Sequence, residues 1–321
     1  MEHIWSYFIQ LGHNMWRDAS YRAEFNGPAQ TQATGRFKEE MYTDREVWKE
    51  TVDFLPSCGI NVVVIDIGEG LLYETHPELS VKGAWTREEL KKELARMRLM
   101  GLEPIPKLNF SAYHDEWLGE YSRMLGTRKY YEVVADLIDE VCEVFDEPRF
   151  FHLGLDEEYI PDHRKAVTVI RSTDLWYSDL YFYMKCLEKH GSRPWVWADP
   201  SRRDREEYVR RMPHDCIQSE GSYERIVTNG KSGLGGLESM VVLGKHGYDQ
   251  IPCVSTWACD QNAAQIINYF ENQGIMDEHF LGLLDAPWAP TDNISRYTLL
   301  NDAYRMKYAK EMFERRHPEL L

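Results

Sequence analysis

The chain has 321 residues, of which 43% are hydrophobic and 28% are charged, with 37 Lys and Arg against 53 Asp and Glu. This composition excludes a disordered segment, and no stretch approaches the ~18 uncharged apolar residues that a membrane span needs. The formal net charge of −16 argues against a nucleic acid or another polyanion as partner, because proteins that bind polyanions present a basic face.

The first predicted unit is a strand over residues 4–12 followed by a helix. Thr43, with Glu46 three residues later, predicts a capping box at the start of that helix, and Pro56 predicts its end. Residues 60–65 form a nearly continuous β-branched run, which is typical of a strand buried in a parallel sheet.

The same unit recurs along the rest of the chain. Thr86 and Glu89 predict a second capping box, before a strand over residues 103–108. Further strands are expected at residues 149–155, 194–198, 215–219, 252–256 and 280–284, and helices at residues 128–145, 173–190, 203–211, 237–245, 263–272 and 294–315. Eight strands alternating with helices predict one (β/α)8 TIM barrel over residues 1–321, without an accessory domain. An open doubly wound sheet is the less favoured alternative.

Two features of the sequence bear on the cellular compartment. The N-terminus lacks the basic region and long apolar run of a secretory signal, which predicts a cytoplasmic location. Removal of a leader would leave the same sequence, so a secreted or periplasmic location stays open. The six cysteines include no CxxC pair, and we expect them to be reduced and structural.

Carboxylates, histidines and tryptophans gather where the predicted strands end, which is where a TIM barrel carries its chemistry. The candidate site residues are Arg17, Asp66, Asn109, His114, His152, Asp156, Glu157, Trp197, Glu220, Trp257 and Trp288. Aromatic rings that face sugar rings, together with carboxylates that bind hydroxyls or transfer protons, are typical of a carbohydrate site. The ten Trp and nineteen Tyr agree with this interpretation, although core packing also uses them.

The fourth predicted strand leads into two adjacent carboxylates. Alternation along the strand places His152, Gly154 and Asp156 on the inward face, so Glu157 reaches the same cavity only if the strand has ended before it. Two carboxyl groups in different surroundings can differ in pKa, as acid–base catalysis requires. A solvated acidic turn is the alternative interpretation of these residues.

The segment His-Leu-Gly-Leu-Asp-Glu at residues 152–157 resembles the His-x-Gly-x-Asp-Glu signature of glycoside hydrolase family 20, the β-N-acetylhexosaminidases. The similarity extends in order over about residues 44–290. The similar segments are 58–66, 77–86 and 103–109. Trp197, Trp257 and Trp288 stand where family members have the tryptophans of the sugar pocket.

The chain also departs from the family pattern. Lys107 and Asn109 stand where acidic residues are usual, and residues 111–114 replace a Pro-Gly-His segment, which leaves the role of His114 open. The family's arginine that holds sugar hydroxyls has only Arg17 as a candidate counterpart, and the common accessory domain is absent from the sequence. These differences indicate a divergent member.

The resemblance implies removal of a terminal β-linked N-acetylhexosamine by a retaining mechanism, in which the acetamido oxygen of the substrate is the nucleophile. Glu157 would be the general acid and base, and Asp156 would orient the acetamido group. The remaining candidate residues would bind the sugar. No cofactor is expected, and no metal site is predicted, because His152 and Asp156 would lie ~13 Å apart along a strand.

Two other functions stay open. A conventional carboxylate pair would combine Glu157 with Glu220, Asp199 or Asp260, although residues 256–258 place no glutamate at the seventh strand, where the commonest barrel glycosidases carry their nucleophile. A barrel that binds glycans without catalysis is the other alternative.

Overall fold

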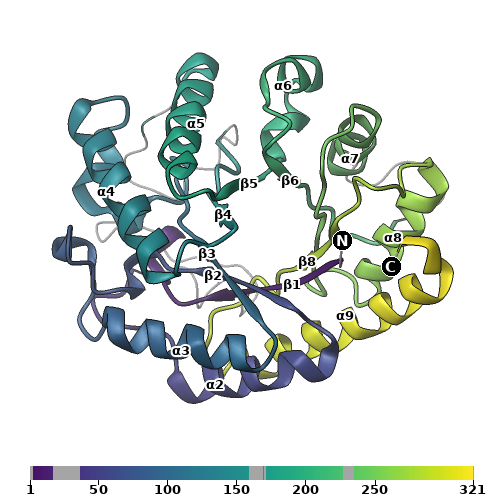
Figure 1. Cartoon of the computed structure of the whole chain (residues 1–321), viewed down its shortest axis with the longest axis horizontal. Helices are drawn as coiled ribbons and strands as arrows, with labels where there is room; N and C mark the ends of the chain where they lie inside the picture. The colour runs from purple at the N-terminus through teal and green to yellow at the C-terminus, as the bar shows by residue number, and fades with distance from the viewer. Residues whose placement is uncertain (1–2, 17–36, 159–168, 170, 227–234, 321) are drawn as a thin grey trace.

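The computed structural model describes residues 3–16, 37–158, 169, 171–226 and 235–320, and Figure 1 shows a ring of helices around a central set of strands. The strands are β1 (Ile4–Gln10), β2 (Val62–Asp66), β3 (Glu103–Lys107), β4 (Phe150–His152), β5 (Arg193–Trp197), β6 (Ile217–Ser219), β7 (Cys253–Val254) and β8 (Gly282–Asp285). Every ladder between them is parallel, in the order β6-β5-β4-β3-β2-β1-β8-β7.

Backbone hydrogen bonds between β6 and the segment around β7 join the two ends of this order. The Gln218 N–H donates to the Asp249 carbonyl at 3.0 Å, and the Ile251 N–H donates to the Gln218 carbonyl at 3.0 Å. The Cys253 N–H adds a bond to the Glu220 carbonyl at 2.9 Å. The predicted (β/α)8 TIM barrel is therefore confirmed, and the open-sheet alternative is wrong.

The helices follow the strands as predicted. They are α2 (Arg45–Phe54), α3 (Arg87–Leu99), α4 (Arg128–Val144), α5 (Thr173–Glu188), α6 (Arg205–Arg211), α7 (Gly235–Lys245), α8 (Asn262–Gln273) and α9 (Arg296–Arg316). No helix in the described ranges is both long enough and apolar enough to cross a membrane. All six cysteines are free thiols, and five of them are buried.

One predicted helix cap is confirmed and the other is wrong. At α3, Thr86 and Glu89 form the expected capping box, with each side chain accepting a hydrogen bond from the other residue's backbone N–H. At α2, Asp44 is the cap, and its side chain accepts from the Glu46 N–H at 2.9 Å. The Thr43 hydroxyl donates to the Leu11 carbonyl at 2.8 Å instead, because the chain here packs against the end of β1.

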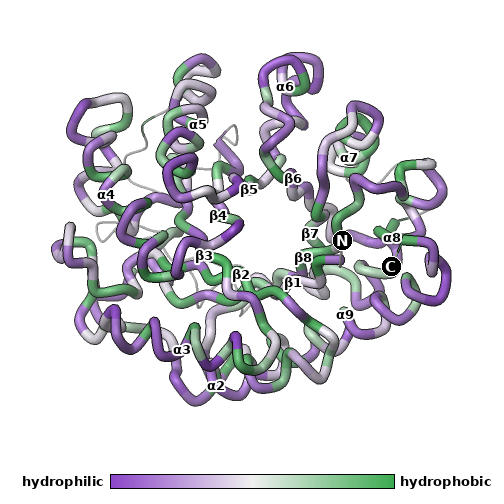
Figure 2. Tube along the Cα trace, viewed as in Figure 1, coloured by the Kyte–Doolittle hydropathy of each residue, from purple (hydrophilic) through white to green (hydrophobic). Residues whose placement is uncertain are grey.

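The hydrophobic core has two layers that follow from the alternation of side chains along each strand. Inward residues such as Phe8, Val64 and Trp195 fill the barrel, whereas outward residues such as Val63 and Val196 pack under the helices. Figure 2 shows mainly hydrophobic residues on the central strands and mainly hydrophilic ones on the outer turns of the helices. Buried polar residues on inward positions are therefore conspicuous, and the carboxyl ends of four neighbouring strands carry them.

Candidate functional site

Four neighbouring strands place a row of polar side chains across the mouth of the barrel. Gln10 pairs in register with Asp66, Asp66 with Lys107, and Lys107 with His152. In each strand, the residue two positions earlier is apolar and points into the barrel, so these four polar side chains also point inward. All four are buried. An amide, a carboxylate, an ammonium group and an imidazole thus lie at one level beneath the mouth.

Lys107 and Asp66 form a buried ion pair within this row. The Lys107 Nζ lies 2.6 Å from the Asp66 Oδ2, and both side chains are 1% exposed. Burial raises the pKa of Asp66, and the positive charge of Lys107 opposes that shift. The lysine that departs from the family pattern is therefore the partner of a predicted site residue, and part of the hydrogen-bonding capacity of Asp66 is used within the protein.

His152 is held as a neutral donor at the same level. Its Nδ1 accepts a hydrogen bond from the Gly154 N–H at 3.1 Å, so the proton of the neutral ring belongs on Nε2. Burial, followed by the charge of Lys107, holds the pKa of His152 well below its ordinary value. Nε2 is buried without a hydrogen-bond partner in the described part of the chain, as are both side-chain polar atoms of Gln10. Such groups are expected to meet a ligand or water.

Strand β4 ends at His152, and the backbone then changes conformation. Gly154 and Leu155 both have φ of 73°, and Glu157 has φ of 54°, so the predicted alternation through Asp156 is wrong. A Cβ at Gly154 would lie 2.1 Å from the Asn109 Oδ1, which leaves room for glycine only. The left-handed conformation of Leu155 and Glu157 is costly for residues with side chains and is typical of functional sites.

This turn lets two adjacent carboxylates reach one histidine. The His114 Nε2 lies 3.3 Å from the Asp156 Oδ2 and 3.0 Å from the Glu157 Oε2. Had the strand continued, the two side chains would point to opposite sides of the sheet. The break that the sequence analysis required for Glu157 to enter the site is therefore present.

The loop after β3 holds Asp156 from a second side. The Asn109 Nδ2 donates to the Asp156 Oδ1 at 3.0 Å, and the Ser111 hydroxyl donates to the Asp156 carbonyl at 2.5 Å. Asp156 is 8% exposed as a residue, whereas the Glu157 side chain is 36% exposed. The two carboxylates thus have different surroundings, one clamped and buried, the other open on one side.

Another acid lies close to this pair. Asp199 is the first residue of the short helix η6 (Asp199–Arg202), which follows β5. Burial raises its pKa well above the ordinary value, with Arg202 opposing the shift and the charges of Glu220, Asp156 and Glu157 adding to it. The sequence analysis named Asp199 only within an alternative mechanism, because a single Asp after a strand gives no signal of its neighbours.

Glu220, a predicted substrate-binding residue, is engaged by protein groups. The Arg202 Nε donates to the Glu220 Oε1 at 3.0 Å, and the Gly221 N–H donates to the same oxygen at 2.8 Å. The carboxylate is buried, and its charge is balanced by Arg202. Arg202 also pairs with Asp199 at 3.3 Å, so Glu220 is linked to Asp199 through this shared arginine.

The predicted tryptophans form an aromatic series on the other side of the mouth. The ring centroids of Trp197 and Trp288 are 5.5 Å apart, and Phe8 lies 6.3 Å and 5.6 Å from them. Trp257 is 50% exposed and joins the series through Tyr223, which lies 6.5 Å from it and 5.9 Å from Trp288. The sequence analysis assigned no role to Phe8 or Tyr223.

His114, Asp156 and Glu157 also have the composition of a metal-ligand group. Their ligand atoms lie within 4.8 Å of one another. The sequence analysis weighed His152 with Asp156 for this purpose, and those two do not form the group. Arg17, the candidate for holding sugar hydroxyls, lies outside the described residues.

The fold is similar to solved structures of β-N-acetylhexosaminidases. The enzyme of Bacteroides fragilis NCTC 9343 aligns with a TM-score of 0.61 at 14% identity, over 99% of this chain and 70% of that one. The family 20 exo-β-N-acetylglucosaminidase of Vibrio harveyi, solved with N-acetylglucosamine, aligns with a TM-score of 0.58 at 11% identity, over 99% and 58%. Dispersin B aligns with a TM-score of 0.56 at 13% identity, over 94% and 97%.

The fold is that of the family 20 barrels. This finding confirms the resemblance predicted from residues 152–157 at the level of the fold, and that motif lies at the end of the fourth strand. The chain spans 70% of the Bacteroides enzyme and 58% of the Vibrio enzyme. No protein-family model and no curated protein matches the sequence.

Proposed function

We propose that this chain is a glycoside hydrolase that removes a terminal β-linked N-acetylhexosamine with retention of configuration. The observation that carries the proposal is the pair of carboxylates after β4, which share His114 but differ in burial and hydrogen bonding. The similarity to family 20 barrels, one of them solved with N-acetylglucosamine, supports the choice of sugar.

Glu157 is the general acid and base in this proposal. Its side chain is open on one side, as proton exchange with a leaving group or water requires. Glu157 donates a proton to the glycosidic oxygen as the bond to the anomeric carbon breaks, and later accepts a proton from the attacking water. His114, at 3.0 Å, fixes the position of the carboxyl group for both steps.

Asp156 acts on the acetamido group in this proposal. The acetamido oxygen attacks the anomeric carbon, so positive charge develops on the acetamido nitrogen, and a carboxylate beside it stabilises that charge. The hydrogen bond from Asn109 fixes one oxygen of Asp156 at 3.0 Å and preorganises the group. A carboxylate already held in place need not reorganise during the reaction.

Residues on both sides of the barrel mouth would bind the sugar in this proposal. Trp197 and Trp288 offer apolar rings to a sugar, while His152 Nε2 and the Gln10 amide offer unsatisfied polar atoms to hydroxyls. The proposed site therefore has an aromatic side and a hydrogen-bonding floor, which is the usual division in small-molecule sites.

The candidate nucleophiles of a conventional carboxylate pair are poorly placed for that role. Burial and neighbouring charges favour the protonated form of Asp199, and a protonated acid is a weak nucleophile. Glu220 is neutralised by Arg202, and Asp260 is 60% exposed and pairs with Arg305 at 3.1 Å. These contacts favour the mechanism in which the substrate supplies the nucleophile.

The test compares aryl β-N-acetylglucosaminides with aryl β-glucosides that lack the acetamido group. We expect hydrolysis of the acetylated substrate only, with a β-configured first product by NMR. Glu157→Gln should slow it, and the control Glu224→Gln, at an exposed carboxylate after β6, should not. Equal hydrolysis of both substrates, or an inverted product, would contradict the proposal.

A further inference from the structure

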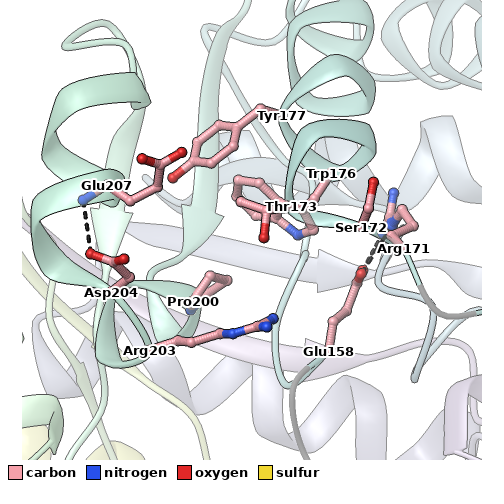
Figure 3. Close-up of a pocket in the computed structure, with 10 residues that line it drawn as sticks. All are labelled: Glu158, Arg171, Ser172, Thr173, Trp176, Tyr177, Pro200, Arg203, Asp204 and Glu207. Carbon is pink, nitrogen blue, oxygen red and sulfur yellow. Dashed lines mark hydrogen bonds and ion pairs between the residues drawn. The ribbon is translucent and has the colours of Figure 1, made fainter.

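Two segments on the rim of the barrel are held in different ways. Figure 3 shows the region of η6 and α6, where Asp204 accepts a hydrogen bond from the Glu207 N–H at 3.0 Å. Glu207 also pairs with Arg211 at 3.1 Å, so the acidic groups of this region are engaged within or next to one short helix. The loop after β7, which carries the exposed ring of Trp257, is held instead by α9, the last α-helix of the chain.

Asp302 of α9 binds two residues of this loop directly and a third through them. Thr256 donates to the Asp302 carboxylate through its hydroxyl and through its N–H, the latter at 3.3 Å. Ser255 adds a side-chain hydrogen bond to Asp302, and the Ser255 hydroxyl accepts from the Trp257 N–H at 3.1 Å. The Asp302 side chain is fully buried, so water does not compete for these contacts.

The charge of Asp302 suits this role. Burial raises the pKa of Asp302 to about 6, and the hydrogen bonds from Thr256 and Ser255 oppose that shift. Above this pH the group is mainly a carboxylate, which can only accept hydrogen bonds, and the loop supplies the donors. Hydrogen bonds to a charged acceptor are stronger than those between neutral groups. Asp302 is therefore a firm attachment for residues 255–257.

The other attachments of the loop do not replace it. Asp260 pairs with Arg305 of α9 at 3.1 Å, but the two side chains are 60% and 40% exposed, and exposed ion pairs contribute little to stability. The Ser255 N–H donates to the Asn262 Oδ1 at 3.1 Å, which fixes only the start of the loop. Loss of Asp302 would therefore release Thr256 and Trp257 while the ends of the loop stay attached.

This attachment determines where the ring of Trp257 stands. Its centroid lies 6.5 Å from that of Tyr223, at an interplanar angle of 90°. Tyr223 in turn lies 5.9 Å from Trp288, one of the rings assigned to the sugar in the proposed function. A mobile ring would have to be ordered when the sugar binds, at a cost in free energy. A ring that the protein already holds does not incur that cost.

We propose that Asp302 is a positioning residue for sugar binding, which holds residues 255–257 so that the ring of Trp257 is in place at the rim before the substrate arrives. The proposal rests on the proposed function, in which rings at the mouth bind the N-acetylhexosamine. Asp302 does not touch the sugar, because it lies on a helix of the outer layer. Its loss should therefore act on KM and leave the chemical step unchanged.

A native thiol tests whether Asp302 holds the loop. Cys259 lies two residues beyond Trp257 and is the one cysteine of the six that is not buried. Asp302→Ala should raise the rate at which an aromatic disulfide reagent modifies Cys259 by about tenfold, because the loop opens more easily. Modification of one thiol rather than six verifies that the variant is folded. The control Asn301→Ala, at the half-buried neighbour of Asp302 on α9, should leave the rate unchanged.

Kinetics test whether the held loop matters for the sugar. In hydrolysis of an aryl β-N-acetylglucosaminide at neutral pH, Asp302→Ala should raise KM by about three- to tenfold with kcat near the wild-type value. Thr256→Val keeps the shape of the residue and removes only the hydroxyl, so it should raise KM less and serves if Asp302→Ala does not fold. In the background of Trp257→Ala, Asp302→Ala should raise KM no further, since both act through one ring.

The outcomes separate the two proposals. An unchanged rate of Cys259 modification in Asp302→Ala and Thr256→Val, an unchanged KM, or effects that add in the double variant would overturn the positioning role and leave the proposed function standing. A fall in kcat as large as the rise in KM would also overturn it, because general damage to the site explains such a pattern. If the wild-type chain hydrolyses no N-acetylated substrate, the proposed function fails, and the thiol rates still decide whether Asp302 holds the loop.

Discussion

The two halves of the barrel mouth differ in chemistry. Strands β1 to β4 end in Gln10, Asp66, Lys107 and His152, which form a buried polar row in register. The half from β5 onward carries rings instead, with Trp197 in contact with Trp288 and, beyond it, Tyr223. The first half thus holds a row of buried polar groups, whereas the second combines aromatic rings with the carboxylates of Asp199 and Glu220, and the carboxylates after β4 lie where the halves meet.

The largest expected effect is on stability, from removal of one charge in the polar half. Lys107→Met leaves Asp66 buried without its partner, which should lower the free energy of unfolding by about 3–5 kcal/mol. Urea denaturation measures this loss. The double variant Lys107→Met with Asp66→Leu removes both charges and should recover most of it, so a double variant as unstable as the single one would refute the pairing argument.

The next effect is on catalysis and separates the two carboxylates. Asp156→Asn should lower kcat by about 10²–10³ for every N-acetylated substrate, because charge stabilisation is lost whatever the leaving group. Glu157→Gln should slow substrates with poor leaving groups far more than activated aryl glycosides, which scarcely need a proton. Kinetics across a series of leaving groups measure both. Parallel losses for the two variants would contradict the division of roles.

These features differ in how far the sequence predicts them. A single sequence is enough to recognise local patterns, such as the β-branched run of β2, the capping box of α3 and the motif at residues 152–157. Strand register is not local, so the polar row and the ion pair of Lys107 could not be predicted. The conformation of Glu157 depends on Gly154 packing against Asn109, a contact between distant segments.

Contacts between distant segments also explain why some residues have another role than the sequence predicted. Glu220 has the residue type and strand position of a binding group, but its carboxylate accepts a hydrogen bond from Arg202 instead. Thr43 has the spacing of a cap, but the end of β1 takes its hydroxyl and Asp44 caps the helix. In each case a partner from another part of the fold decides how the side chain is used, and residue type and spacing alone do not identify that partner.

A third prediction concerns pH and a buried acid beside the polar row. Burial raises the pKa of Glu69 from 4.5 to about 7, so the folded state favours its neutral form. The stability that this form contributes is complete below about pH 4.5 and is lost as pH rises toward 7, a change of about 3 kcal/mol. Glu69→Gln should reduce the slope of stability against pH between those values by this contribution, as thermal unfolding measures it, while other buried acids such as Asp302, with a pKa raised to about 6, keep theirs. An identical slope in variant and wild type would exclude Glu69 as its source.

The smallest expected effect on stability lies at the outer end of the aromatic half. Trp257 is 50% exposed, and among the described residues its ring neighbour in the series is Tyr223, so Trp257→Ala should change the free energy of unfolding by no more than about 0.5 kcal/mol. Trp197→Ala, at a buried ring beside His152, should cost about 3–5 kcal/mol.

If Trp257 is a binding residue, its loss should still raise KM for N-acetylated substrates while the melting temperature stays near the wild-type value. Unchanged KM would place the aromatic contact with sugar at Trp197 and Trp288 alone, whereas a large drop in melting temperature would show that the exposed ring is part of the packed structure.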